Sequence, residues 1–271
     1  YEAATADLND VNMIDPFHLA AYGVTTVNYN RDVEIFPVLR TMFETMLGRC
    51  PYQSPTDMGV NMAGSCIIDD EVCRQASNHE ILRRYYTARK DLLQGRADRE
   101  LVDKLELLMK KADVTPDIFP AVAAALEKES RTGAPAGAMV MPDGAVITGK
   151  TSDLLGASAA LLLNALKHLG GIDQTFDLIS AQVLAPICRL KTGSLGGKNP
   201  RLHSDEVLIA LCISAVTNPM AARAQEQIPK LAGCDAHFTV ILSDVDDRLY
   251  RKLGIHISCE PKCERQRLYY K

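Results

Sequence analysis

Apolar residues recur at helical spacing through the first half of the chain. The clearest stripes lie in three segments, 33–47, 69–93 and 99–111. Because apolar side chains three and four residues apart share one face of a helix, each segment is predicted to form an amphipathic helix. Asp32 is a suitable N-cap for the first helix, whereas Pro37 fits a first helical turn and would place the start later.

A fourth helix is predicted to begin near residue 115. Thr115, Pro116 and Asp117 supply a capping side chain, a preset first turn and a negative charge at the positive end of a helix. Glycine and proline interrupt the helical pattern over residues 133–137. We therefore place a domain boundary after residue 131.

The second half of the chain alternates strands and helices. Two β-prone runs, 138–141 and 145–148, flank the turn residues Pro142–Gly144, which is typical of a β-hairpin. An apolar helix is predicted over 152–169, further helices over 181–190, 205–216, 221–231 and 245–253, and further strands over 237–242 and 255–259. The pattern predicts an α/β (α+β) fold, with a polar opening segment and helical subdomain over 1–131 and an α/β subdomain over 132–271.

Composition excludes several classes of protein. The 271 residues are 47% hydrophobic and 24% charged, which is typical of a globular chain rather than a disordered or collagen-like one. The longest apolar stretch, 154–166, is interrupted by polar residues and glycine, so we expect no membrane span and no membrane partner. Lys and Arg number 30 against 34 Asp and Glu, and this net charge of −4 argues against nucleic acid as a partner.

Cysteine usage and the chain start indicate the surroundings. The eight cysteines are scattered rather than spaced as a disulfide framework, which predicts reduced thiols in a cytoplasmic protein. The chain begins with Tyr1 and shows no signal peptide, so we expect a piece of a longer protein. Cys259, Cys263 and His256 lack the spacing and the number of ligands that zinc needs, and no metal site is predicted.

A phosphate-binding pattern lies at the predicted hairpin. Residues 144–151 satisfy G-x-x-x-x-G-K-[ST], the pattern of a P-loop. A P-loop wraps its backbone around phosphate, whereas the β-branched residues 146–148 prefer an extended backbone. A hairpin that delivers Lys150, Thr151 and Ser152 to an anion-binding helix N-terminus is therefore the favoured interpretation. The alternative is a solvated lysine beside a simple serine cap.

A second candidate site is the Gly-rich loop over residues 191–203. Its basic and amide side chains, Lys198 and Arg201 among them, suit a phosphate or a carboxylate, although a solvated loop is the competing interpretation. His203 is a candidate general base beside Asp205.

The opening segment interleaves polar and large apolar residues, which is typical of a site or an interface. Candidate catalytic residues there are Asp10, Asp15, His18 and Asp57, with Asp10 and Asp15 as partners of a metal or a hydroxyl group. Candidate ligand-binding residues there are Asn30, Arg31 and Asn61, with Asn30 and Arg31 orienting a phosphate or a carboxylate. The alternative is a surface linker without a site.

The residues also resemble a known family. The similarity lies in six runs, residues 1–15, 25–37, 54–64, 142–157, 198–210 and 252–255, and spans essentially the whole chain. The chain resembles the C-terminal portion of the bacterial proteins with domain of unknown function 1846. The resemblance implies a cytoplasmic protein with a further upstream part that carries a Gly-rich GSGK segment.

The resemblance also implies a helical subdomain followed by an α/β subdomain of cytidine-deaminase-like topology, in which a β-hairpin precedes a core helix. Deaminase chemistry needs an H-x-E and a P-C-x-x-C motif, and the sequence has neither. A shared fold by itself names no reaction.

Two functions are therefore expected. In the first, the chain is the C-terminal region of a nucleotide- or phosphate-ligand-dependent protein and forms one wall of a cleft for an anionic small molecule. The missing upstream domain would then bind most of the nucleotide. In the alternative, the chain is a non-catalytic oligomerisation or small-molecule-binding module, with the helices over 69–130 as the surface of a homo-oligomer.

Overall fold

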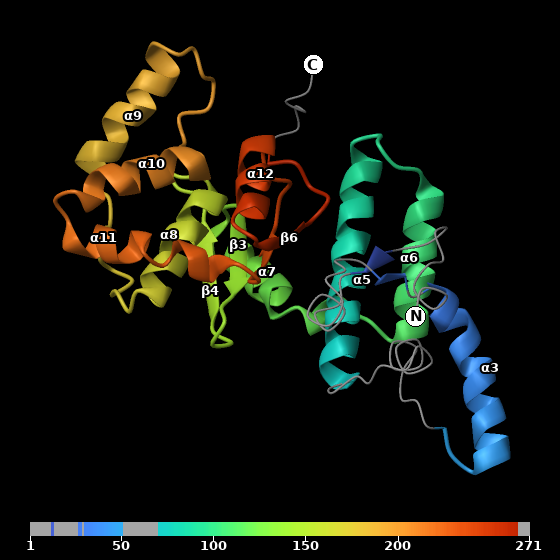
Figure 1. Ribbon diagram of the computed structural model, residues 1–271. Coiled ribbons are helices and arrows are strands. Elements are labelled where there is room, and N and C mark those ends of the chain that lie inside the picture. Colours follow the sequence, from blue (N-terminus) through green and yellow to red (C-terminus); the bar gives the residue numbers. More distant parts are fainter. Residues whose placement is uncertain (1–11, 14–26, 29, 51–69, 265–271) are drawn as a thin grey trace. The chain divides into compact units, whose positions relative to one another are not determined.

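The computed structural model describes the backbone of residues 12–13, 27–28, 30–50 and 70–264, and side chains at positions 38, 40–50, 78–79, 81–107, 109–110 and 113–264 (Figure 1). The chain divides into two compact units. The first consists of residues 1–85 and 103–115, and the second of residues 86–102 and 116–271. The boundary expected after residue 131 stays a prediction.

Helices predominate in the described part of the first unit. They are α3 (Asn30–Leu47), most of α5 (Asp70–Leu93) and most of α6 (Arg99–Ala112), and a short antiparallel pair joins β1 (Asn12–Met13) to β2 (Val27–Asn28). The helices predicted from the apolar stripes are confirmed. The N-cap assigned to Asp32 is wrong, because α3 begins two residues earlier and continues through Pro37.

The second unit is a mixed α/β body. Its helical elements are η1 (Pro116–Ile118), α7 (Pro120–Thr132), α8 (Ala157–Leu169), α9 (Ala181–Gly193), α10 (Ser204–Ala215), α11 (Pro219–Gln225), η2 (Ile228–Leu231) and α12 (Asp244–Lys252). Its strands are β3 (Ala136–Val140), β4 (Val146–Lys150), β5 (Asp235–Phe238) and β6 (His256–Cys259). The sheet has the order β4-β3-β5-β6, and only the β5–β6 pair is parallel.

The predicted hairpin is confirmed by the antiparallel pairing of β3 with β4, in which Met139 lies opposite Ile147. The helix predicted to start at Ser152 begins only at Ala157, so Lys150, Thr151 and Ser152 do not form its N-terminus. The reason is a tight turn, in which the Ser152 amide donates to the Leu155 carbonyl at 2.9 Å.

Three further predicted boundaries are corrected. Thr115–Asp117 leads only into η1, and α7 starts at Pro120, where proline occupies the first helical turn. The single helix predicted over 221–231 is divided, because η2, with Pro229, follows α11 as a separate turn. The strand predicted over 237–242 ends at Phe238.

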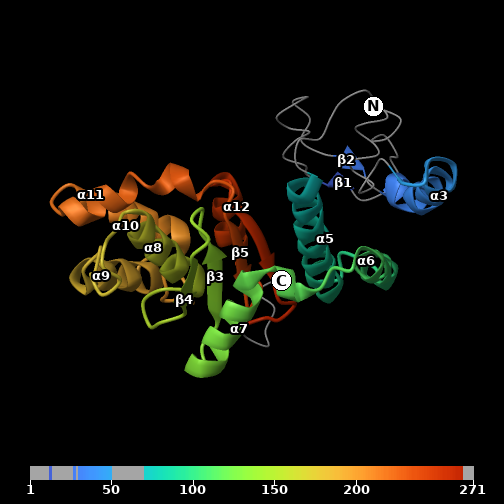
Figure 2. The ribbon, with the colours of Figure 1, turned by 90° about the horizontal axis from the view of Figure 1, so that it is seen from below.

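The sheet is covered on both faces. Figure 2 shows α7 and α8 on opposite sides of it. Ala138 of β3 packs with Ala121 and Ala125 of α7, whereas its neighbour Met139 belongs to the main apolar core with Leu161 of α8. This alternation follows from the two-residue period of a strand.

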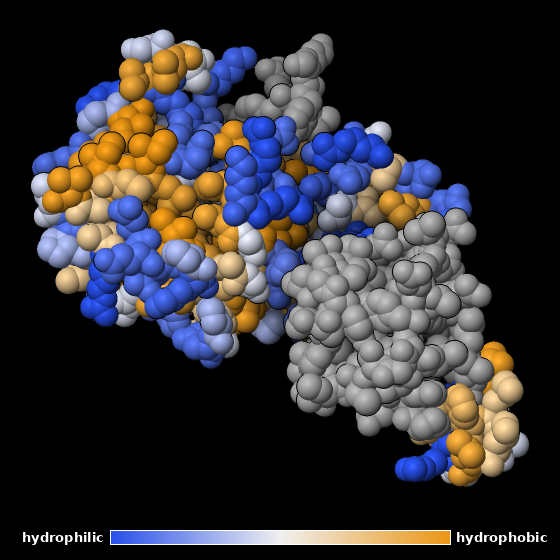
Figure 3. Space-filling view, viewed as in Figure 1, coloured by the Kyte–Doolittle hydropathy of each residue, from blue (hydrophilic) through white to orange (hydrophobic). Residues whose placement is uncertain are grey.

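Apolar side chains also remain on the surface. Figure 3 shows them gathered over the part of the second unit formed by α9, α10 and α11. On α10, Ile209 and Ile213 are 62% and 61% exposed. None of the helices with described residues has the length and the apolar character needed to cross a membrane.

Candidate functional site

A cavity of the second unit lies where α8, α10 and α12 begin. It has a volume of about 370 Å³, within the range of small-molecule sites. Its lining residues are Gln94, Thr151, Gly156, Ala157, Ser158, Asn199, Arg201, Leu202, His203, Val240, Ile241, Leu242, Ser243, Asp244, Asp246, Cys263 and Glu264. The cavity therefore receives side chains from segments far apart in the sequence.

Backbone hydrogen bonds bring the starts of α8 and α10 together. Leu155 and Leu202 form a parallel bridge, in which the Leu202 amide donates to the Leu154 carbonyl at 2.8 Å. The Gly156 amide then donates to the Leu202 carbonyl at 3.3 Å. Both chain segments enter a helix within two residues of this bridge, at Ala157 and at Ser204. The two helix N-termini consequently lie beside each other.

Asp246 connects the start of α12 to the start of α10. One carboxylate oxygen, Oδ1, accepts from the Ser204 amide at 2.8 Å and from the Ser204 hydroxyl at 2.7 Å. The other oxygen, Oδ2, accepts from the Ser243 hydroxyl at 2.6 Å and from Nδ1 of His203 at 3.0 Å. The buried carboxylate thus has a full set of hydrogen-bond donors, as a buried charge requires.

Opposing effects set the pKa of Asp246. Burial raises the pKa of the carboxyl group, but hydrogen bonds from His203, Ser243 and Ser204 outweigh burial and lower it to about 2. The hydrogen bond to Asp246 raises the pKa of His203 above its ordinary value, against the opposing effect of burial. The pair therefore favours an ionised carboxylate beside an imidazole that holds its proton more firmly.

The partner predicted for His203 was wrong. Asp205, its neighbour in sequence, accepts instead from the Glu206 amide, and the partner of the imidazole is Asp246, forty-three residues later. The backbone amide of His203 donates to Glu206 at 2.7 Å, and the same carboxylate pairs with Lys191 at 2.7 Å. These contacts fix the start of α10, and with it the imidazole ring, at the wall of the cavity.

The N-terminus of α8 is open toward the cavity. Its N-cap, Gly156, has no side chain that could accept a hydrogen bond. The first amide groups of the helix are therefore available to an acceptor from a ligand. Ser158 and Thr151 lie beside it with 4% and 6% of their surface exposed. In the described part of the chain neither hydroxyl has a hydrogen-bond partner. Neither oxygen is among the buried side-chain atoms without a partner, which among the described residues are Ser214 Oγ, Gln227 Oε1 and His237 Nε2. Both hydroxyl groups are therefore accessible from the cavity and available to a ligand or to water.

Two of the predicted ligand-binding residues line this cavity, and three do not. Thr151 and Arg201 line it. Lys150 and Lys198 are exposed elsewhere, and the Ser152 hydroxyl accepts from the Leu155 amide within its own turn. The Arg201 guanidinium donates to the Ser152 carbonyl and to Glu264, so its charge is already paired within the protein.

The P-loop interpretation of residues 144–151 does not fit the backbone. Val146–Lys150 is a strand, which cannot wrap around a phosphate. Gly149 faces α8, where a Cβ atom would lie 2.3 Å from the Leu161 amide nitrogen. The glycine of this motif therefore serves the close packing of strand and helix.

The remaining predicted residues cannot be placed. Asp10, Asp15, His18, Asp57 and Asn61 lie outside the described residues. Asn30 and Arg31 form the first turn of α3, with side chains outside the described set. Their roles stay predictions.

Sequence reasoning missed Gly156, Ser158, Ser204, Ser243 and Asp246. Ser243 followed by acidic residues is a readable helix start, and its hydroxyl does accept from the Asp246 amide. No local pattern shows, however, that this carboxylate reaches across to α10.

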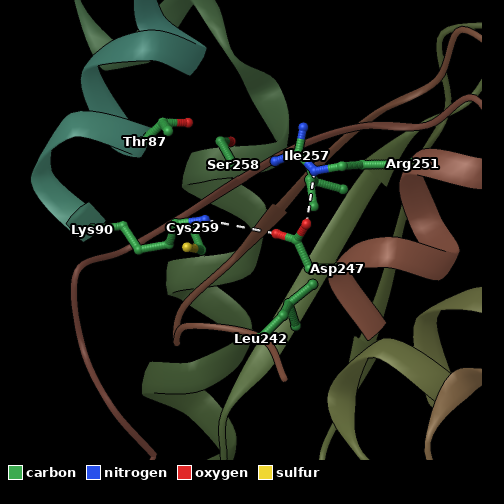
Figure 4. A pocket seen from close by; sticks show the side chains of 8 residues that line it. All are labelled: Thr87, Lys90, Leu242, Asp247, Arg251, Ile257, Ser258 and Cys259. Atoms are coloured by element: carbon green, nitrogen blue, oxygen red, sulfur yellow. Dashed lines mark hydrogen bonds and ion pairs between the residues drawn. The ribbon is translucent and has the colours of Figure 1, made fainter. Parts of the chain in front are cut away.

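A second, smaller cavity of about 10 Å³ is filled by structural ion pairs. Figure 4 shows Asp247 between Lys90 and Arg251, with ion-pair distances of 3.7 and 2.7 Å. Burial raises the pKa of the nearby Cys259 thiol to about 11, so the reactive thiolate is disfavoured. Among side chains that the structure describes, no group of three or more His, Cys, Asp or Glu is placed to hold a metal ion.

Comparisons with known proteins give the family. Residues 1–113 match the model described as "Domain of unknown function DUF1846, N-terminal", and residues 117–269 match "Domain of unknown function DUF1846, C-terminal". The expectation that the chain resembles only a C-terminal portion of the family is thereby corrected, since both domain models match.

Bacterial relatives match over the whole chain. A UPF0371 protein of Corynebacterium efficiens is 55% identical over 271 residues, which are 100% of this chain and 55% of the relative. A UPF0371 protein of Streptococcus thermophilus is 53% identical, with the same coverage of both chains. The chain spans about half the length of the curated relatives it matches. Two family models that together match nearly every residue show that the chain belongs to the DUF1846 family.

Proposed function

We propose that the cavity binds a small phosphate-bearing ligand, with the phosphate at the N-terminus of α8. The observation that carries this proposal is the open helix start, where Gly156 leaves the first amides uncapped beside the unpartnered hydroxyls of Ser158 and Thr151. Amide groups at a helix start, together with hydroxyl donors, form the usual cradle for a phosphate.

The electrostatics of the cavity support this choice. A helix N-terminus carries a partial positive charge that stabilises an anion by about 0.3 to 1 kcal/mol when exposed and up to about 2 kcal/mol when partly buried. Two of the three carboxylates that line the cavity have partners of their own. Asp246 accepts hydrogen bonds from His203, Ser204 and Ser243, and Glu264 is paired with Arg201. The third, Asp244, begins α12.

The rest of the ligand is proposed to extend along the polar wall formed by Asn199 and Ser243. A nucleotide is one such ligand, and in the longer relatives we propose that further residues complete the cleft. The cytidine-deaminase-like topology belongs to the same proposal and is supported by the β3–β4 hairpin that precedes the core helix α8. Assembly through a homo-oligomer stays a prediction.

Substitutions at Gly156 test the site without removing any side chain. A Cβ atom there would meet Ser158 Oγ at 3.7 Å and the Leu202 carbonyl at 3.8 Å, both ordinary contacts. In Gly156→Asp, the carboxylate caps α8 and repels an anion. We expect phosphate affinity to fall more than tenfold while the folded state gains about 0.5 kcal/mol. Isothermal titration calorimetry with inorganic phosphate and ADP measures the affinity, and urea unfolding measures the stability.

Gly156→Ala is the matched control. It adds the same Cβ atom without an acceptor or a charge, so the amides of α8 stay open and affinity is expected to remain within about threefold of the original chain. Equal phosphate affinity in Gly156→Asp and Gly156→Ala would contradict the proposed site.

A further inference from the structure

The hydrogen bonds of His203 leave one ring nitrogen to the cavity. Nδ1 lies 3.0 Å from Asp246 Oδ2 and 3.3 Å from Ser243 Oγ. Because the ionised Asp246 can only accept, Nδ1 must carry a proton in both charge states of the ring. Nε2, on the opposite edge, has no protein partner among the residues described. The imidazolium form therefore has one unused N–H donor at the cavity wall.

The backbone places His203 close to the start of α8. His203 follows Leu202, whose carbonyl accepts from the Gly156 amide, so the residues that begin the two helices are neighbours across that bridge. An anion at the open end of α8 consequently lies on the same wall as the imidazole.

Charged groups from α9, α10 and α12 act on the ring. Asp246 of α12 bonds it directly, and Lys191 of α9 and Glu206 of α10 act on it electrostatically with opposite signs while they pair with each other. The remaining charged or titratable side chains of the cavity are Arg201, Asp244, Cys263 and Glu264. The Lys191–Glu206 and Arg201–Glu264 pairs each combine opposite charges, and His203 is the histidine among the residues that line the cavity.

We propose that protonated His203 donates its Nε2–H to an oxygen of the bound anion, so that each binding event requires one proton on the imidazole. This inference rests on the proposed phosphate site and adds to it a preference among anionic ligands. The cavity then prefers doubly charged phosphate-like groups, because such a group accepts from both the α8 amides and the imidazolium. Asp246, Ser204 and Ser243 act as positioning residues that hold the ring and its proton.

Inorganic sulfate tests the proposal, because sulfate remains a dianion across the neutral range and any pH dependence belongs to the protein. Calorimetric titrations of the whole chain from about pH 5.5 to 9.5 are expected to show constant affinity below the pKa of His203 and a tenfold loss for each pH unit above it. Nitrogen chemical shifts of the ring, recorded with and without sulfate, give that pKa directly, and sulfate should raise it.

Two variants and a control separate this effect from general charge. His203→Gln is expected to bind sulfate more weakly than the original chain, with an affinity that does not depend on pH. Asp246→Asn is expected to lose sulfate affinity from a lower pH than the original chain, because Asp246 raises the pKa of His203. His168→Gln removes an imidazole that pairs with Asp143 outside the cavity, and it should leave the sulfate curve unchanged. If Asp246→Asn does not fold, the ring shifts of the original chain and His203→Gln still decide the question.

The outcomes distinguish the two proposals. Sulfate binding that Gly156→Asp abolishes but pH leaves unaltered would overturn the role of His203 and keep the phosphate site. Absence of sulfate and phosphate binding at every pH would overturn both. If sulfate affinity fell with rising pH as much in His203→Gln as in the original chain, the proton would belong to another group and the inference would be refuted.

Discussion

Replacing Gly149 with alanine is expected to destabilise the second unit by at least about 3 kcal/mol. The added Cβ atom would lie 2.3 Å from the Leu161 nitrogen, 2.5 Å from its Cα and 2.9 Å from the Ala160 carbonyl carbon. These are backbone atoms of α8 that cannot rotate away, so strand β4 and helix α8 must separate. Overpacking of a core costs about 1 to 3 kcal/mol and more where no side chain can yield. Urea unfolding followed by circular dichroism measures the loss.

Gly193→Ala is the control for that experiment. A Cβ atom added at Gly193 would meet no other atom within 4 Å, and the residue has no positive φ, so alanine there should be neutral or slightly stabilising. A Gly149→Ala variant as stable as the original chain would show that strand and helix are not in this close contact. If such a variant also lost phosphate affinity, the P-loop interpretation of residues 144–151 would be restored.

Asp246→Asn is expected to cost about 3 kcal/mol at neutral pH. The neutral amide keeps the shape of the side chain but presents only one acceptor oxygen to donors on Ser204, Ser243 and His203. Removing one partner of a buried charged pair typically costs about 3 to 5 kcal/mol, and the remaining amide oxygen recovers a part. Urea unfolding of the two proteins at about pH 7 measures the difference.

The same residue predicts a loss of stability in acid. Hydrogen bonds lower the pKa of Asp246 to about 2, below its unfolded value of 3.8. Its contribution is therefore fully present above about pH 4 and is lost as pH falls toward 2, by about 2 kcal/mol in total. The raised pKa of His203 acts in the other direction, because its contribution is present below about pH 6.5 and declines at higher pH.

Asp205→Asn serves as the matched control for Asp246→Asn. Asp205 lies at the same helix start, but among the described residues its carboxylate accepts only from the Glu206 amide. We expect Asp205→Asn to lower the free energy of unfolding by less than about 1 kcal/mol. Equal losses in the two variants, or an Asp246→Asn difference that persists unchanged at pH 2, would refute the assigned role of Asp246.

Local patterns predicted much of the fold. The hairpin was predictable because residues 145–148 are β-prone and follow a Pro-Asp-Gly turn, and the amphipathic helices because their apolar stripes are long. The start of α8 was not predictable, because Ser152 has the side chain of a typical N-cap. Its hydroxyl instead accepts a hydrogen bond within a turn, and the bridge from Leu155 to Leu202 stabilises that turn. A tertiary contact forty-seven residues away decided that boundary.

The candidate site was predictable only in fragments. Thr151, Arg201 and His203 were singled out from the sequence and do line one cavity. The phosphate motif that drew attention to Thr151 has a different cause, since Gly149 serves packing against Leu161. The carboxylate that organises the site, Asp246, bonds residues more than forty positions away, and no spacing in one sequence carries that information.

The most direct measurement of the phosphate site is a titration of the isotope-labelled chain with inorganic phosphate, followed through backbone amide chemical shifts. We expect the largest and saturable changes on Ala157, Ser158 and Ala159 at the start of α8, and we expect Gly156→Asp to remove them. Saturable changes centred instead on residues 144–150, with the α8 amides unmoved, would contradict a phosphate site at this helix.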